Sequence, residues 1–327
     1  MVHLQEVDGL EHNLLPYRRA LPLMWVLAVW AFAKTVVTII CWTIPTTFAT
    51  TRSFKATLRA VTVRYANGPP RSASFWFDGQ SKTLAAIRAG ATSYRALDII
   101  YNHLNLDVEG TFGARLGRWW VDMANAQAVR NRLRITESLL SQQIWSRVAK
   151  KRVRILSIAS GSAQAVVAAV AKCRQAIQAE GGDLEVRLLD RDPAALAYAK
   201  QLAEHHGVGQ YFTYFQGDAG DFRTVACDRG TWQPDIVEMV GFLDYRPRDK
   251  AISLVGKVRQ VVAPDGVFLT CHIAANPEAF VLRWLIKWPM LYRSPEAIEE
   301  IVRLGGFGRT EVLQEPHEIH TIVVGLT

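Results

Sequence analysis

The residues best suited to chemistry follow three short apolar runs in the second half of the chain. The first run is followed by a turn of small residues at 159–163 (ASGSA). Small residues let the backbone approach a ligand closely, and the N-terminus of a following helix favours negative charge. The second run ends at Asp190, whose carboxylate could accept both hydroxyls of a ribose. The third ends at Asp218, which could accept a hydrogen bond from an adenine amino group. Three such groups in succession indicate a site for an adenosine-containing cofactor.

Each of these groups also has a simpler structural explanation. The turn at 159–163 has one glycine and could serve close packing alone. Asp190 could cap the next helix, although Asp192 is the better cap because it directly precedes Pro193. A nicotinamide cofactor would also place an acid on its ribose, but the GxGxxG sequence of such sites is absent. A nicotinamide-dependent oxidoreductase is therefore the weaker interpretation.

The elements that must position these groups alternate between short apolar runs and helical segments. The expected strands cover residues 153–159, 185–190, 211–218, 234–241 and 267–273, and the expected helices cover 163–179, 193–205 and 247–262. Such alternation with short connections predicts βαβ units, and hence a parallel, doubly wound sheet. Ligands of these sheets bind beyond the carboxyl ends of the strands, where the strand order reverses.

Residues 153–327 resemble class I S-adenosylmethionine-dependent methyltransferases, and more narrowly a methyltransferase family that occurs alone or fused to α/β hydrolases. The segments that carry the resemblance are ILSIASGSA, LLDRDPAALAYAK, FQGDAGDF, PDIVEMVGFLDY and APDGVFLT. NAQAVRNRLRI upstream, and RSPEAIEEIVRLGGF and HTIVVGLT near the end, also match. The resemblance implies a Rossmann-like α/β fold, with a doubly wound seven-stranded methyltransferase sheet. A helical lid and a membrane helix are expected on its N-terminal side.

The same resemblance implies S-adenosylmethionine as the cofactor. The implied cofactor-binding residues are Ser157, Ala159, Gly161, Asp190, Arg191, Asp218, Ala219, Val240 and Gly241. In this family the turn would pass the methionine part, the first acid would hold the ribose and the second the adenine amine. Two departures matter: Ser157 stands where the family usually has an acid, and the turn keeps only Gly161. They could weaken the contact to the cofactor's ammonium group, so a non-catalytic cofactor-binding module stays an alternative.

The catalytic residues are the least determined part of the site. Methyl transfer from a sulfonium needs mainly proximity and in-line geometry, so no dedicated motif is required. Tyr245 or Asp244 could orient an acceptor or take its proton, and His272 ends the fifth expected strand at the same edge of the sheet. Alternatively, Tyr245 packs under the lid, Asp244 caps the next helix, and His272 is a buried histidine with satisfied hydrogen bonds. No Asn/Asp-Pro-Pro-Tyr/Phe sequence follows the fourth strand, which argues against methylation of base amino groups.

The N-terminal part differs from the rest in composition. Residues 20–42 form an apolar run about as long as a bilayer span. Lys34 is costly within a membrane but could snorkel, and the alternative is a buried helix. Several basic residues follow the run, which would place the larger C-terminal part in the cytoplasm. We therefore expect a hydrophobic segment at 1–50, a helical lid or substrate region at 51–150 and a cofactor-binding methyltransferase domain at 151–327.

Composition narrows the function less than these motifs do. The chain has 327 residues and a net charge of +8, which suits nucleic acid, anionic lipid or an anionic cofactor. Its four cysteines are scattered without a CxxC pair, so the sequence supports neither a metal site nor a disulfide framework. The aromatic and basic stretch at 279–292 could stack bases, lie at a membrane interface or pack as a helix on the sheet.

Together these features predict a membrane-associated methyltransferase that uses S-adenosylmethionine on a small-molecule or lipid-like acceptor. Its catalytic domain would face the cytoplasm; without the membrane segment, the protein would be cytoplasmic. An RNA methyltransferase is the alternative, although nucleic acid is the less favoured partner. The sequence does not specify the acceptor, the methylated atom or the oligomeric state.

Overall fold

The structure is a computed structural model that describes residues 7–12, 26, 29, 33, 81–105, 112–148, 152–226, 232–284 and 286–327. These residues form two compact units. The first contains the described parts of Met1–His12, Gln127–Ala279 and Pro289–Thr327, and the second those of Asn13–Ala126 and Phe280–Trp288. Residues 127–148 therefore group with the first unit.

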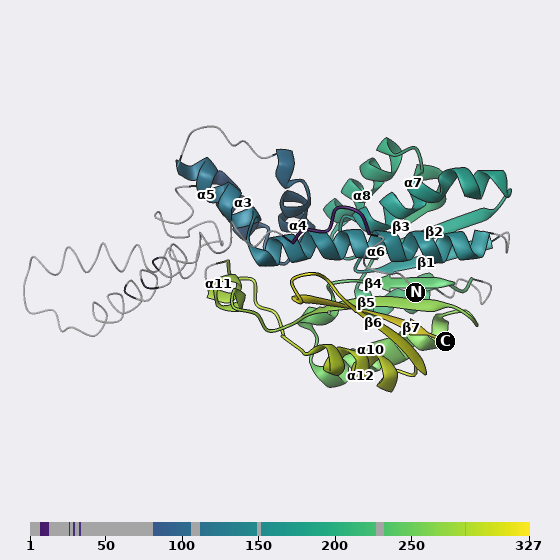
Figure 1. The fold of residues 1–327 in the computed structure, drawn as a ribbon. Coiled ribbons are helices and arrows are strands. Elements are labelled where there is room, and N and C mark those ends of the chain that lie inside the picture. Colours follow the sequence, from purple (N-terminus) through teal and green to yellow (C-terminus); the bar gives the residue numbers. More distant parts are fainter. Residues whose placement is uncertain are drawn as a thin grey trace, which may run out of the picture. The chain divides into compact units, whose positions relative to one another are not determined.

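The first unit is built on a seven-stranded sheet with the order β3-β2-β1-β4-β5-β7-β6 (Figure 1). Its strands are β1 (Arg152–Ile158), β2 (Asp183–Asp190), β3 (Phe212–Gln216), β4 (Ile236–Met239), β5 (Val267–Ile273), β6 (Arg309–Gln314) and β7 (His320–Leu326). Strands β1 to β5 pair in parallel, and β7 is antiparallel to both β5 and β6. The predicted seven-stranded, doubly wound α/β sheet is confirmed.

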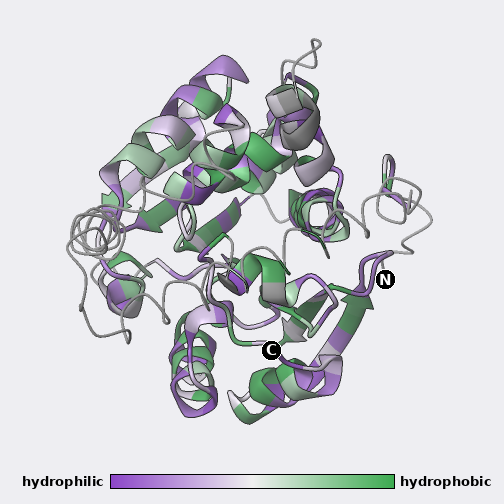
Figure 2. Cartoon of the chain, turned by 90° about the vertical axis from the view of Figure 1, so that its left-hand side faces the viewer, coloured by the Kyte–Doolittle hydropathy of each residue, from purple (hydrophilic) through white to green (hydrophobic). Residues whose placement is uncertain are grey.

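Helices cover both faces of this sheet. They are α6 (Ala124–Val148), α7 (Gln164–Ala179), α8 (Pro193–His205), α9 (Phe222–Ala226), α10 (Arg248–Val261) and α12 (Pro295–Leu304). One buried apolar cluster joins the sheet to α6, α7 and α8, and a second joins it to α9, α10 and α12. Ile155 of β1 belongs to the first cluster and Leu156 to the second. A central parallel strand is covered on both faces, which is why every residue of β1 after Arg152 is buried. In Figure 2 the apolar strands lie between helices with hydrophilic outer surfaces.

Local signals set the start of α8 at the residue predicted from the sequence. Asp192 is the N-cap, and its Oδ1 accepts a hydrogen bond from the Ala194 backbone amide at 2.9 Å. Pro193 occupies the first helical position, where its missing amide hydrogen is not needed. The confirmed cap means that Asp190 does not cap α8.

The second unit contains α3 (Lys82–Ala89), α4 (Tyr94–Tyr101) and α5 (Phe112–Val121), with α3 packed against the other two. Gly117 lies within α5. A Cβ at Gly117 would come within 2.9 Å of atoms of Ser81 and Thr83. The glycine thus permits close packing of two helices, which a sequence pattern cannot distinguish from a turn.

The stretch at 279–292 is not one helix. Helix α11 covers only Ala279–Trp284, and an irregular segment follows. Ile286 and Trp288 in that segment are buried, with 0% and 8% exposure. The expected aromatic and basic helix is therefore corrected to a short helix followed by buried apolar anchors.

The expected membrane segment lies almost entirely outside the described residues. Of residues 20–42, the structure describes only Val26, Val29 and Ala33. Among the helices that are described, none combines the length and the apolar character that crossing a bilayer requires.

Candidate functional site

The strand order of the sheet reverses between β1 and β4. The chain passes from β1 to β2 and β3 on one side, whereas β4 pairs with the other edge of β1. Such a switch point is where open α/β sheets bind ligands, beyond the carboxyl ends of the strands. All nine predicted cofactor-binding residues lie near the carboxyl ends of β1 to β4, or in the turns that follow them.

The turn after β1 has an unusual backbone. Ala159, Gly161 and Ala163 have φ angles of 54°, 52° and 50°, in the left-handed region. That conformation costs a non-glycine residue roughly 1–2 kcal/mol, so glycine is the usual choice. The loss of glycines that the sequence shows has therefore not removed the left-handed backbone of the turn.

Asp190 connects the turns that follow three strands. Its Oδ2 accepts from the Gly161 amide at 2.8 Å, and its Oδ1 accepts from the Asp192 amide at 2.9 Å. Its backbone carbonyl accepts from the Gly217 amide at 3.0 Å, in the turn after β3. Each carboxylate oxygen retains a lone pair beyond these bonds. Asp190 thus combines a structural role with spare capacity to accept hydrogen bonds.

The residues next to β2 and β3 are more open. Arg191 and Asp218 are exposed, and Ala219 is buried with 6% exposure. Asp218 Oδ1 accepts from the Gly220 amide at 2.8 Å and so caps the short turn η4 (Ala219–Asp221). This bond uses one of its oxygens and leaves the other toward solvent.

A carboxylate that the sequence analysis missed lies between β1 and β4. Glu238 of β4 stands opposite Ser157 of β1 in the strand register. Ser157 Oγ donates to Glu238 Oε2, and the Val240 amide donates to Glu238 Oε1 at 2.9 Å. Burial raises the pKa of Glu238 to about 7, although these hydrogen bonds and the charge of Arg132 oppose the rise. The signal in the sequence was a glutamate within the otherwise apolar strand IVEM.

His272, a predicted catalytic residue, has both ring nitrogens engaged. It is 1% exposed; its Nδ1 contacts Asp244 Oδ1, and its Nε2 contacts Arg293 Nη1. Because a guanidinium can only donate, Nε2 is the acceptor and Nδ1 carries the proton. The structure therefore shows the alternative considered above, a buried histidine with satisfied hydrogen bonds.

Asp244 does not cap the next helix, contrary to the alternative drawn from the sequence. Its Oδ1 also accepts from the Ile273 amide at 3.0 Å. Burial raises the pKa of Asp244, but the hydrogen bond from His272 and the nearby positive charges bring it below its ordinary value. Arg293 donates further to the carbonyls of Leu243 and Arg246. These contacts fix η6 (Leu243–Tyr245), which carries the half-buried Tyr245.

Comparison with known proteins assigns a family to this arrangement. Residues 71–326 match the model of a family described as "Putative methyltransferase". The chain belongs to this family. No curated protein matches the sequence.

Two solved structures each match three quarters of this chain. A possible exported protein from Bordetella parapertussis is 16% identical, with a TM-score of 0.60, over 75% of this chain and 83% of the other. Magnesium protoporphyrin IX methyltransferase from Synechocystis is 14% identical, with a TM-score of 0.48, over 75% of this chain and 99% of the other. At 16% identity, the similarity to the Bordetella parapertussis protein concerns the fold alone.

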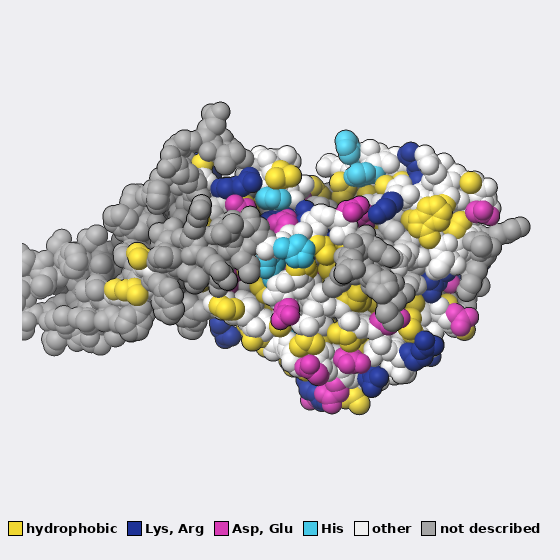
Figure 3. Space-filling view, in the orientation of Figure 1, with side chains coloured by type: hydrophobic (Ala, Val, Ile, Leu, Met, Phe, Trp, Pro, Cys, Tyr) yellow, Lys and Arg dark blue, Asp and Glu magenta, His cyan; other side chains and the backbone are white. Residues whose placement is uncertain are grey.

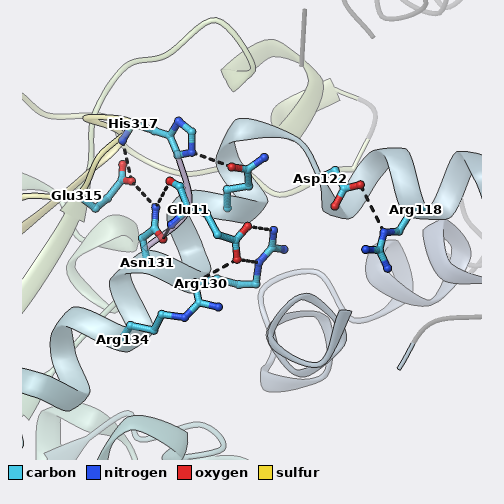
Figure 4. A network of polar contacts seen from close by, with 9 residues as sticks. Glu11, Arg118, Asp122, Arg130, Asn131, Arg134, Glu315 and His317 are labelled. Carbon is cyan, nitrogen blue, oxygen red and sulfur yellow. Dashed lines mark hydrogen bonds and ion pairs between the residues drawn. The ribbon is translucent and has the colours of Figure 1, made fainter. Parts of the chain in front are cut away.

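Arg130 of α6 is buried and forms an ion pair with Glu11. It is 2% exposed, and its Nε donates to Glu11 Oε1 at 2.6 Å (Figure 4). Arg134 also contacts Glu11, and Asn131 donates to Glu315 Oε2 at 3.2 Å. This network holds residues 7–12 against α6 and the β6–β7 hairpin. Within the described residues, no group of three or more His, Cys, Asp or Glu side chains could hold a metal ion.

Proposed function

We propose that this methyltransferase family member binds S-adenosylmethionine at the carboxyl ends of β1 to β4 and transfers its methyl group. The observation that carries the proposal is Asp190, whose hydrogen bonds join the turns after β1, β2 and β3 while its carboxylate keeps acceptor capacity. It would hold the ribose hydroxyls. Asp218, beside Arg191 and Ala219, would accept from the adenine amine. The turn at Ala159 and Gly161 would pass the methionine part, with Val240 and Gly241 on its other side.

One buried polar atom in the turn supports this fit. Ser160 Oγ is buried, and it has no hydrogen-bond partner within the described part of the protein. A buried hydroxyl without a partner costs free energy, which a polar ligand at the turn would recover. The left-handed residues of the same turn supply the close backbone approach that such a ligand needs.

When bound, S-adenosylmethionine supplies a methyl group on a sulfonium centre that is already activated for transfer. The protein therefore has to hold the acceptor in line, and proximity is the main contribution. We assign Tyr245 to the orientation of the acceptor or to removal of its proton. His272 becomes a positioning residue, because it acts on η6 through Asp244.

The acceptor we propose is a small molecule or a lipid-like molecule, with the protein associated with a membrane through the apolar run at 20–42 and the catalytic part facing the cytoplasm. RNA is the weaker candidate. On the face drawn in Figure 3, the described Lys and Arg side chains are interspersed with Asp and Glu instead of gathering in one patch. The buried Ile286 and Trp288 could not stack on bases.

The test is calorimetric titration of S-adenosylmethionine and S-adenosylhomocysteine into the full-length protein, beside Asp190→Ala. Asp192→Ala is the matched control, because it removes a carboxylate two residues away that only caps α8. We expect binding of the wild type and of the control, and a loss of at least about 100-fold in Asp190→Ala, which removes two charge-assisted hydrogen bonds. Absence of binding in the wild type would refute the proposed cofactor. Labelled methyl donor with a lipid extract would then identify acceptors, and salt-sensitive RNA binding would favour the alternative.

A further inference from the structure

Glu238 is a buried acid that has no role in the binding and transfer steps proposed above. It is 7% exposed, and it lies at the carboxyl end of β4, one strand from the turn at 159–163. Its hydrogen-bond partners are the Ser157 hydroxyl and the Val240 amide. These two donors occupy about half of the acceptor sites of a carboxylate, which has roughly four. A carboxylate held in this way can accept further donors.

We propose that Glu238 receives the ammonium group of the cofactor's methionine part, and that Ser157 orients it for this contact. The inference rests on the proposed function. In it, Glu238 of β4 takes the role of the acid that the family usually has at the position of Ser157 in β1. The register places Ser157 of β1 directly opposite Glu238 of β4. The carboxylate is therefore supplied by the neighbouring strand, at the same switch point of the sheet.

The order of the strands agrees with the order of groups along the cofactor. Asp218 follows β3, Asp190 ends β2, the small-residue turn follows β1 and Glu238 ends β4. Neighbouring strands lie about 4.8 Å apart, so Glu238 and Asp190 are separated by about 10 Å across the sheet. Adenine, ribose, the methionine chain and its ammonium would therefore meet successive strands in sequence.

The groups around Glu238 do not fully offset the cost of burying its negative charge. Arg132 of α6 acts on it from one side, and the hydrogen bonds from Ser157 and Val240 favour its charged form. Burial nevertheless leaves its pKa at about 7. A bound ammonium would add the opposite charge that stabilises an ionised carboxylate in a buried place.

The experiment compares three ligands that differ at the methionine end, each titrated into the full-length protein. S-adenosylhomocysteine carries the ammonium, its desamino analogue lacks only that group, and 5′-methylthioadenosine lacks the whole amino acid part. The proteins are wild type, Glu238→Gln and Ser157→Ala, which keeps the carboxylate but removes the hydroxyl that orients it. We expect the wild type to prefer S-adenosylhomocysteine over the desamino analogue by about 10- to 100-fold, as for a charge-assisted hydrogen bond. Glu238→Gln should lose that preference and bind 5′-methylthioadenosine as the wild type does. Ser157→Ala should lose part of the preference, because the carboxylate remains but is no longer oriented.

Two results would overturn the inference. One is a wild-type protein that binds both homocysteine ligands equally well, which needs no variant to fold. The other is a Glu238→Gln protein that keeps the full preference, because the ammonium is then recognised elsewhere. If Glu238→Gln does not fold, Glu238→Asp replaces it, because it keeps the charge but withdraws the carboxylate by one carbon. This variant should reduce the preference for the ligand with the ammonium group. An unchanged preference would contradict the inference. A wild type that binds none of the ligands refutes the proposed function itself, which separates the two failures.

Discussion

The carboxyl ends of β1 to β3 and those of β4 and β5 differ in how their polar groups are hydrogen-bonded. On the first side, backbone amides of three turns meet one half-buried acid, Asp190, and Asp218 is exposed. On the second side, the buried side chains of Asp244 and His272 are bonded to one another, and the half-buried Arg293 is bonded to His272. The first side keeps hydrogen-bond capacity for a ligand. The second has used most of its capacity to fix a loop, and Glu238 at the border shares features of both.

The largest effect we expect comes from the second side. Asp244→Ala would leave the His272 ring and the Ile273 amide buried without their acceptor, at a cost of about 3–4 kcal/mol of unfolding free energy. Urea denaturation measures it. The control Asp218→Ala, at an exposed position of the first side, should cost less than about 1 kcal/mol. Equal losses in the two variants would contradict the distinction between the sides.

The pH dependence of the same difference follows from the pKa of Asp244. A folded-state pKa below the ordinary value means that ionised Asp244 stabilises the folded protein above about pH 4. This contribution is lost as the pH falls through the lowered pKa. The gap between wild type and Asp244→Ala should therefore narrow only in strong acid, and a gap that narrows near neutral pH would contradict the assignment.

The contribution of Glu238 to folding stability depends on pH in the opposite direction to that of Asp244. Its folded pKa of about 7 lies above that of an unfolded glutamate, so the folded state prefers the protonated acid. In the absence of ligand, its contribution is most favourable below about pH 4 and is lost as the pH rises to about 7. Glu238→Gln should accordingly gain on the order of 2 kcal/mol of stability relative to wild type between pH 4 and pH 8. Unfolding free energies measured across that range would reveal it, and a flat difference would show that Glu238 is not buried as described.

Gly241, which follows β4, should tolerate a side chain poorly. Its φ angle is 80°, and a Cβ there would lie 3.2 Å from Arg132 Nη1. We expect Gly241→Ala to cost about 1–2 kcal/mol of unfolding free energy. Gly181→Ala, at a φ of 58° with nothing within 4 Å of a new Cβ, is the control for backbone strain alone. A difference between the two variants measures the contact with Arg132.

The smallest effect belongs to the turn after β1. Ala159→Gly and Ala163→Gly should each relieve left-handed strain, and we expect gains of up to about 1 kcal/mol, partly offset by the greater flexibility of unfolded glycine. Thermal unfolding detects this shift. Ala169→Gly, in the interior of α7, should instead destabilise by about 1 kcal/mol or more. Destabilisation at 159 and 163 as well would mean that their methyl groups matter more than their φ angles.

The sequence by itself determined the strands and helices of the sheet and much of the candidate cofactor side. The runs at 153–159, 185–190 and 267–273 became β1, β2 and β5 within two residues at each end, and α8 begins and ends as predicted. Hydrophobic periodicity and helix caps are local signals, and residues near the ends of parallel strands are brought together by the topology. Asp190 and Gly161 could thus be predicted to meet, because a βαβ unit places the ends of β1 and β2 side by side.

Only the tertiary structure decided which buried polar groups are paired. Ser157 and Glu238 are separated by 81 residues, and Glu11 and Arg130 by 119. Their meeting depends on the order and register of the strands and on the packing of α6, to which no local pattern responds. The same holds for His272, whose place at a strand end suggested catalysis, whereas Asp244 and Arg293 occupy both its nitrogens. Composition and periodicity predict that a residue is buried, but the partner that makes burial of a polar group tolerable is set by the assembled fold.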